Sequence, residues 1–186
     1  FKGFSPHKRT ISIIYQVGVP SIIMQSISSV MTFGLNKILI SFSETAVAVF
    51  GVYFKLQSFI FMPIFGLNNG MIPIIAYNYG ARNKKRIMET VRLSIGIAVG
   101  IMLIGLAVFQ LMTPQLLMLF QADADMLSIG VPALRIISLS FLFAGYCIIV
   151  GSVFQAMGNG VYSLIISVAR QLVCILPLAY FFAQVF

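Results

Sequence analysis

The chain has 186 residues, of which 60% are hydrophobic and 9% are charged, and its mean hydropathy is +1.02. These residues supply too little polar surface to cover a soluble domain of this size, so the composition excludes a water-soluble globular protein. The net charge of +8 could indicate nucleic-acid binding. We exclude that class because the basic residues cluster between apolar runs, as they do in the cytoplasmic loops of membrane proteins.

Five apolar runs predict an all-α membrane protein, a bundle of about five transmembrane helices, because each run is at least as long as the ~20 residues that cross a bilayer. We expect the spans at residues 11–42, 46–77, 93–112, 131–156 and 161–182. Thr113 and Pro114 should end the third span. Nothing divides residues 1–186 into more than one domain, and the start at Phe1 and the end at Phe186 indicate a fragment of a longer chain.

The charges between the spans predict how the chain lies in the membrane. Three basic residues precede the first span: Lys2, Lys8 and Arg9. The segment 78–92, which we expect to be a loop, contains one acid and five basic residues: Glu89, Arg82, Lys84, Lys85, Arg86 and Arg92. The segment after the third span contains Asp123 and Asp125 and no basic residue. Because basic loops face the cytoplasm, we expect a cytoplasmic amino end and a carboxyl end outside.

Polar side chains inside the spans are the candidate functional residues, since each costs free energy unless it faces a cavity or a partner. In the first span, four such residues share one helical face: Gln25, Ser29, Thr32 and Asn36. They form either the wall of a hydrated cavity, which would offer hydrogen bonds to a cargo, or a set of interhelical hydrogen bonds that holds the bundle together. Their spacing fits both interpretations.

A second face runs along the second span and combines a cation, an aromatic ring, a thioether and a carboxamide. Its members are Lys55, Phe59, Met62, Gly66, Asn69 and Pro73. Such a face suits an amphiphilic ligand. We expect Phe59 to pack within the protein, and Lys55 either belongs to the ligand face or reaches towards the outer surface.

Helix-bending and small residues also mark the second and third spans. Two prolines of the second span each remove a backbone hydrogen bond and favour a bend: Pro63 and Pro73. Between them, Asn68 and Asn69 are enclosed by two glycines, Gly66 and Gly70. In the third span, a small-xxx-small pair of glycines predicts close packing against another helix: Gly96 and Gly100.

In the fifth span, one predicted stripe consists of Ser163, Ser167, Arg170, Cys174 and Pro177. Arg170 either pairs with an acid elsewhere in the full protein or reaches back to the cytoplasmic interface, and we favour a structural role. Cys147 and Cys174 lie in apolar runs without metal-ligand or disulfide spacing, so we expect both to be small buried hydrophobic residues.

The predicted spans contain no carboxylate, since all four acids fall in predicted loops: Glu44, Glu89, Asp123 and Asp125. A membrane-embedded acid that binds H⁺ or Na⁺ would therefore lie in sequence beyond this chain. His7 stands alone in a basic segment, and no catalytic constellation can be assembled. We expect neither an enzyme nor a bound cofactor or metal.

Three local sequences are the most distinctive in the chain. They are Pro63, Gly66, Gly70 and Pro73 followed by Tyr77-Asn78-Tyr79-Gly80-Ala81-Arg82 and Arg86; Phe154-Gln155-Ala156-Met157-Gly158-Asn159; and Leu176-Pro177-Leu178. Together they resemble the multidrug and toxic compound extrusion (MATE) family of transporters over nearly the whole chain. The resemblance implies half of a two-lobe, twelve-helix protein, with this chain as the carboxyl-terminal lobe, roughly helices seven to eleven.

Members of that family export organic, often cationic, drugs in exchange for H⁺ or Na⁺ by alternating access. Some of them carry coupling carboxylates in this lobe, and this sequence has none there. The resemblance therefore implies that the coupling ion, H⁺ or Na⁺, binds in the missing amino-terminal lobe. It also implies an integral protein of a bacterial or archaeal inner membrane.

The expected substrate-cavity residues are Gln25, Ser29, Thr32, Asn36, Lys55, Met62, Asn68, Asn69 and Arg170. The expected partners are small organic cations or other amphiphilic small molecules, membrane lipid and the amino-terminal six-helix lobe of the same protein. Two alternatives to drug export are a flippase for lipid-linked precursors and a non-transporting membrane scaffold. A flippase needs a cationic cavity, for which Lys37, Lys55 and Arg170 are available.

Overall fold

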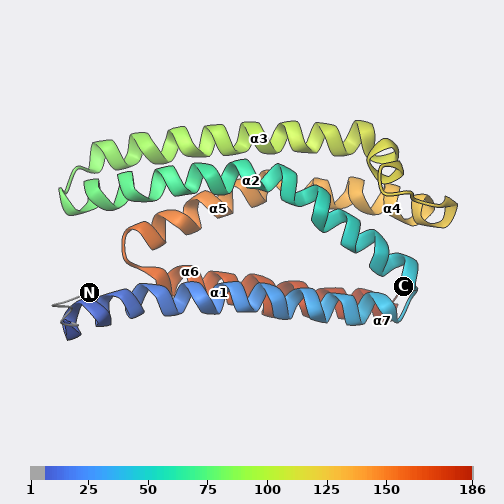
Figure 1. Ribbon diagram of the computed structural model, residues 1–186, viewed down its shortest axis with the longest axis horizontal. Helices are drawn as coiled ribbons and strands as arrows, with labels where there is room; N and C mark the ends of the chain where they lie inside the picture. Colours follow the sequence, from blue (N-terminus) through green and yellow to red (C-terminus); the bar gives the residue numbers. More distant parts are fainter. Residues whose placement is uncertain (1–6, 186) are drawn as a thin grey trace, which may run out of the picture.

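A computed structural model describes residues 7–185, which are helical almost throughout and contain no strand (Figure 1). The elements are α1 (Lys8–Ile40), α2 (Glu44–Gly80), α3 (Lys84–Met118), α4 (Ala124–Ser138), α5 (Phe141–Ala156), α6 (Gly160–Val168), the π-helix η1 (Ala169–Ile175) and α7 (Leu176–Val185). This arrangement confirms the predicted all-α bundle. Lys2 and the rest of residues 1–6 lie outside the described part.

Three helices, α1, α2 and α3, are each long and apolar enough to cross a membrane. The pair α4 and α5, which is bent by 48°, accounts for up to one more span. The region of the fifth predicted span is occupied by α6, η1 and α7, which follow one another without a break. Each of the five apolar runs thus corresponds to one helical passage along the bundle (Figure 1).

The segment 78–92 is not the loop that its charge suggested. Helix α2 continues to Gly80 and α3 begins at Lys84, so only residues 81–83 connect them. Asn83 caps α3, because its side chain accepts a hydrogen bond from the backbone N–H of Arg86 at 3.2 Å. Lys and Arg are good helix formers, so a basic segment with such a cap forms an exposed helical turn.

The third helix is broken close to the predicted end of the third span. At Met112 (φ −116°, ψ 16°) the backbone leaves helical geometry directly before Thr113 and Pro114, so the straight part of α3 ends where predicted, and a second short helix follows to Met118. Pro114 cannot donate the next backbone hydrogen bond, and the hydroxyl of Thr113 donates to the carbonyl of Phe109 at the kink. Beyond the kink, Leu117 is completely buried, and this packing keeps the last turn helical.

Side chains support the bend between α4 and α5. The hydroxyl of Ser138 donates to the carbonyl of Arg135 at 2.7 Å, and that of Ser140 donates to Ile137 at 2.7 Å. From α3, the Nε2 of Gln110 donates to the Arg135 carbonyl at 2.8 Å and to the Ser138 hydroxyl at 2.9 Å. Backbone groups released by the bend are thereby paired within the bundle, as a membrane interior requires.

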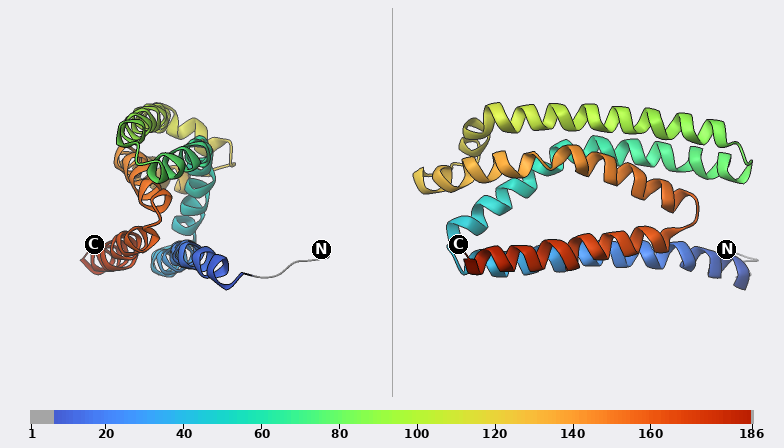
Figure 2. Two further views of the ribbon diagram at one scale, coloured as in Figure 1. Left: turned by 90° about the vertical axis from the view of Figure 1, so that its left-hand side faces the viewer. Right: turned by 180° about the vertical axis from the view of Figure 1, so that it is seen from behind.

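The helices form two groups, with α2, α3, α4 and α5 in one and α1, α6, η1 and α7 in the other (Figures 1 and 2). Phe141 of α5 lies at the centre of the first group. Its ring makes edge-to-face contacts with Phe109 of α3, at a centroid distance of 5.1 Å, and with Phe61 of α2, at 5.6 Å. One aromatic cluster therefore joins three helices of this group.

Close helix approach occurs at glycines other than the predicted pair. Added Cβ atoms at three glycines would lie within 3.0 Å of a neighbouring helix of the first group: Gly105 (2.6 Å from Ile60 Cγ2), Gly145 (2.8 Å from Met102 Cγ) and Gly130 (2.9 Å from Leu117 Cδ1). At Gly96 and Gly100, a Cβ would meet nothing within 4 Å. The expected close packing there is wrong within this chain, because Gly96 lies about half a turn from Gly105 around α3.

Candidate functional site

The four polar residues of α1 lie on one face of a continuous helix, as predicted. Gln25 and Ser29 are exposed, and Thr32 and Asn36 are half-buried. The Thr32 hydroxyl donates to the carbonyl of Ser28 in its own helix at 2.9 Å. Within the described residues none of the four hydrogen-bonds to another helix, so they do not hold this bundle together and stay available to groups outside it.

The predicted face of α2 is exposed along its whole length. All six members, Lys55, Phe59, Met62, Gly66, Asn69 and Pro73, are exposed. The expected packing of Phe59 is wrong within this chain, because its side chain is 73% exposed and that of Met62 is 66% exposed. Lys55 places its Nζ 5.7 Å from the centroid of the Phe120 ring, a cation–π contact with the turn that follows α3.

Asn68 and Asn69 point in different directions. Asn69 is exposed on the face just described, whereas Asn68 is 7% exposed and belongs to the buried side of α2. The side-chain oxygen of Asn68 has no hydrogen-bond partner among the described residues. A buried amide with an unpaired acceptor is unusual and costs free energy. Because Asn68 lies on the buried side of α2, it cannot share one binding surface with Asn69.

The stripe predicted in the fifth span does not form one surface. Ser163 is buried and donates to the carbonyl of Gly151 at 2.7 Å, whereas Arg170 is exposed. The π-helix η1 is wider than an α-helix, so it rotates the residues that follow it relative to α6. Cys147 is exposed rather than buried, and the side chain of Cys174 lies outside the described part.

Sequence reasoning missed Gln171. This residue of η1 is 6% exposed, and its Oε1 has no hydrogen-bond partner within the described chain. Its one available signal was an amide next to Arg170 in an apolar run. The π-helix that turns Gln171 inward gives no periodic signal in a single sequence.

A cavity of about 590 Å³ lies between the two helix groups. It is lined by Met31, Leu35, Ile38, Leu39, Phe42, Phe50, Tyr53, Phe54, Gln57, Ile137, Ile175 and Ala179. Among the described side chains, Tyr53 and Gln57 alone bring polar atoms to it, and none of the nine predicted cavity residues is among its described lining. The apolar cavity between the two helix groups and the polar faces of α1 and α2 are therefore two different surfaces.

The four acids lie at or near helix ends. Glu44 is the first residue of α2, Asp123 caps α4 by accepting from the Met126 N–H at 2.8 Å, and Asp125 lies in the first turn of α4. Glu89 forms an exposed ion pair with Arg86 at 3.4 Å. No group of three or more His, Cys, Asp or Glu residues that could hold a metal ion occurs among the described residues.

The fold and these faces define an integral helical membrane protein with two largely exposed polar helix faces. Comparison with known proteins agrees, since the model of the MatE family matches residues 20–181. The chain therefore belongs to the MATE family of transporters.

Two similar proteins are multidrug export proteins named MepA. That of Staphylococcus haemolyticus is 27% identical over 174 residues, which are 94% of this chain and 38% of that protein. That of Staphylococcus aureus (strain MSSA476) is 30% identical over 158 residues, 83% of this chain and 34% of that protein. The chain thus spans well under half the length of these relatives.

Solved structures of the family share the fold. One is an outward-facing multidrug resistance MATE transporter of the MOP superfamily, with a TM-score of 0.90 at 29% identity, covering 99% of this chain and 42% of that one. Another is a MOP superfamily transporter from Pyrococcus furiosus, described as having a binding pocket of reverse polarity. It has a TM-score of 0.91 at 28% identity and covers 99% of this chain and 42% of that one.

Proposed function

We propose that this chain is the carboxyl-terminal lobe of a secondary active exporter of organic, often cationic, drugs and toxic compounds, driven by H⁺ or Na⁺ antiport. The exposed face of α2 carries the proposal. It offers an aromatic ring, a thioether and an amide along one helix, and Phe59 and Met62 have no packing partner that covers them. An amphiphilic molecule needs this combination of apolar surface and isolated polar groups.

The surroundings of this face support a second lobe. Lipid cannot satisfy the hydrogen-bonding groups of Gln25, Asn36 and Asn69, so these side chains need water or protein opposite them. The MepA relative from S. haemolyticus is much longer than this chain, which covers 38% of it. We infer that an amino-terminal lobe faces α1 and α2 and encloses with them a hydrated central cavity.

Replacing three amides tests this role. In the full-length protein, the triple variant Gln25→Ala, Asn36→Ala, Asn69→Ala should lower the rate of ethidium export from loaded cells about tenfold, since each lost hydrogen bond is worth roughly 0.5–1.5 kcal/mol. The control is Ser26→Ala, because Ser26 is an exposed neighbour whose hydroxyl donates to its own helix, to the carbonyl of Ile22 at 3.0 Å. Export by the triple variant equal to that of the control would contradict the proposal and favour another cargo, such as a lipid-linked precursor.

The coupling ion, H⁺ or Na⁺, belongs in this proposal to the amino-terminal lobe. Single substitutions of the four acids, Glu44→Gln, Glu89→Gln, Asp123→Asn and Asp125→Asn, should each leave ion-driven export within about twofold of the parent. Asn in place of Asp123 keeps the cap of α4, so stability is retained. Flux in vesicles with an imposed H⁺ or Na⁺ gradient measures the effect, and loss of gradient dependence in any one variant places a coupling group in this lobe instead.

The placement of charge supports an inner membrane with the amino end in the cytoplasm. The start of α1, with Lys8 and Arg9, lies at the same end of the molecule as the turn between α2 and α3, which is rich in basic residues (Figure 1). The start of α4, with Asp123 and Asp125, lies at the other end. This asymmetry is the one that the positive-inside rule expects.

A further inference from the structure

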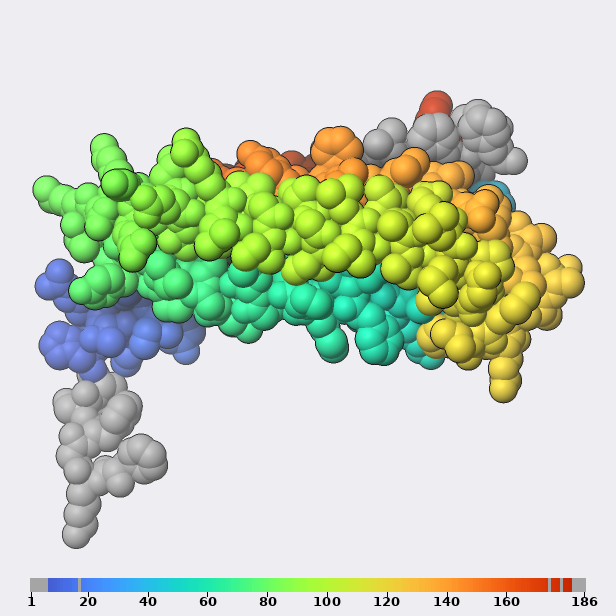
Figure 3. Space-filling view, turned by 90° about the horizontal axis from the view of Figure 1, so that it is seen from above, coloured from blue at the N-terminus to red at the C-terminus, as the bar shows by residue number. Residues whose placement is uncertain are grey.

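We propose that a groove between α2 and α3 binds one acyl chain of an anionic phospholipid, whose phosphate contacts Arg86. The groove has a volume of about 490 Å³ and lies between the carboxyl-terminal half of α2 and the amino-terminal half of α3. Figure 3 shows α3 lying along α2 over this length. The proposal does not depend on export, because Gly66 is the one member of the described α2 face that lines the groove, and none of the polar residues assigned to the substrate lines it.

The body of the groove is apolar. Met71 and Ser94 are buried and form its floor, and Ile74, Leu93 and Ile97 are exposed along its sides. In a membrane-spanning bundle, exposed aliphatic side chains around a narrow groove contact hydrocarbon, and an acyl chain fits between them without leaving a polar group unpaired. The groove therefore suits a single hydrocarbon chain rather than a polar molecule.

Two glycines keep the far end of the groove open. A Cβ at Gly66 or Gly70 would meet nothing within 4 Å, so the space beside α2 there is unfilled. Gly66 and Ile74 are separated by about 12 Å along the helix axis. This length is close to the depth of one leaflet, about 15 Å, which is half of a ~30 Å hydrocarbon core. A chain that starts at Arg86 and ends beside Gly66 thus stays within one leaflet.

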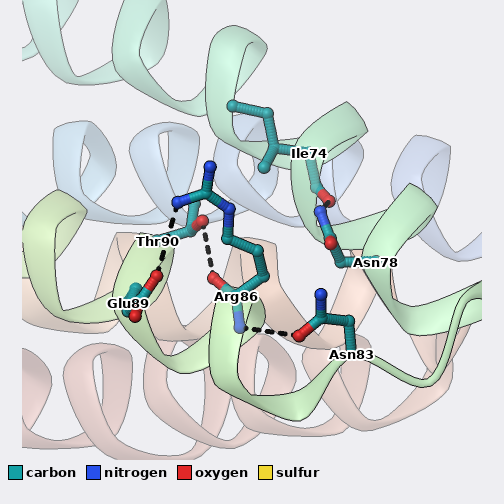
Figure 4. Close-up of polar contacts among 6 residues, drawn as sticks. All are labelled: Ile74, Asn78, Asn83, Arg86, Glu89 and Thr90. Carbon is teal, nitrogen blue, oxygen red and sulfur yellow. Dashed lines mark hydrogen bonds and ion pairs between the residues drawn. The ribbon is translucent and has the colours of Figure 1, made fainter.

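The mouth of the groove is charged and held in place. Arg86 donates through Nη1 to Glu89 Oε2 at 3.4 Å, and the Thr90 hydroxyl donates to the Arg86 carbonyl at 2.9 Å. Figure 4 shows the Arg86 guanidinium extending between these two residues and Ile74. A guanidinium has five N–H donors, so the bond to Glu89 leaves others free for a phosphate oxygen.

The charge around the mouth selects an anionic head group. Within residues 82–92, five basic side chains accompany the single acid Glu89. A cluster of this size beside a transmembrane helix attracts anionic lipids more than zwitterionic ones. The local pair of Arg86 and Glu89 could also complement an ethanolamine head group, but the excess of positive charge favours a lipid with net negative charge.

Lipid binding to the purified full-length protein tests the proposal, with native mass spectrometry counting bound lipids. Dioleoyl phosphatidylglycerol should bind at one site more tightly than dioleoyl phosphatidylcholine or dioleoyl phosphatidylethanolamine. Arg86→Gln should weaken phosphatidylglycerol binding about fivefold. Gly70→Leu, whose Cβ meets nothing within 4 Å and whose side chain occupies the groove, should weaken it at least as much, and millimolar inorganic phosphate should not displace the lipid.

The matched control is Lys85→Gln. It removes one positive charge next to Arg86 in the sequence, but the Lys85 side chain does not line the groove. It should change phosphatidylglycerol binding less than twofold. Equal weakening by Arg86→Gln and Lys85→Gln would show a diffuse electrostatic attraction and overturn the proposal. Equal affinity for the three lipids, displacement by phosphate, or full binding by Gly70→Leu would each overturn it as well.

Discussion

Replacing Phe141 with alanine should lower the free energy of unfolding by about 3 kcal/mol. Phe141 is 1% exposed, and its ring joins α5 to Phe109 of α3 and Phe61 of α2 by edge-to-face contacts. Helices that separate within a micelle stay in an apolar medium, so burial from water contributes little. The loss arises mainly from the cavity left behind and from the lost ring contacts.

The matched control for this prediction is Phe143→Ala. Phe143 lies two residues further along α5 and is 76% exposed, so its removal leaves no cavity inside the bundle. SDS-induced unfolding of the full-length protein in mixed micelles measures both variants, and we expect a change below about 0.5 kcal/mol for the control. Similar losses for the two variants would contradict the assignment of the aromatic cluster as the centre of the first helix group.

The second large effect is expected for Gly145→Leu, which should destabilise the protein by about 3 kcal/mol or more. A Cβ at Gly145 would already lie 2.8 Å from Met102 Cγ and 3.4 Å from the carbonyl oxygen of Ala98. Met102 Cγ lies close to the backbone of its own helix and can move little, and the backbone oxygen of a helix cannot move away alone. A leucine therefore forces α5 away from α3.

Gly96→Leu is the control, because a Cβ there meets nothing within 4 Å. It should leave the SDS-unfolding transition within about 0.5 kcal/mol of the parent, since most surface substitutions away from contacts have effects of this size. The two variants also test whether close helix packing follows the spacing of small residues, as at Gly96, or the contacts in the structure, as at Gly145. Equal destabilisation at Gly96 and Gly145 would restore the spacing argument.

Composition and periodicity predicted the parts of the fold that depend on the bilayer alone. An apolar run must form a helix because lipid leaves no other way to pair its backbone, so the all-α bundle followed from the sequence. The faces of α1 and α2 were predicted for a similar reason. Asn69 and Lys55 fall on one side of any straight α-helix, whatever packs against it.

Features that depend on particular contacts could not be predicted. Pro114 signals a helix end, and the backbone does break at Met112, but nothing in the sequence shows that a short helix with a buried Leu117 follows. The basic residues around Arg86 suggested a loop, but Asn83 caps the start of α3 and the segment is helical from Lys84. Likewise, nothing in the spacing of Asn68 and Asn69 told which of the two would be buried, since that depends on where α3 and α5 lie.

The positions of the close glycine contacts show which helices are packed most tightly against each other. Gly105, Gly130 and Gly145 each join helices of the first group, and Gly34 joins α1 to Leu176 of α7 in the second. None of these four contacts links one group to the other, and the 590 Å³ cavity lies between them. A force applied to α1 therefore moves α6, η1 and α7 with it. The chain connects the two groups at residues 41–43 and 157–159, and the Ser163 hydroxyl also bonds the Gly151 carbonyl beside the second turn, so we expect the two groups to move relative to each other mainly at residues 41–43 and along the cavity.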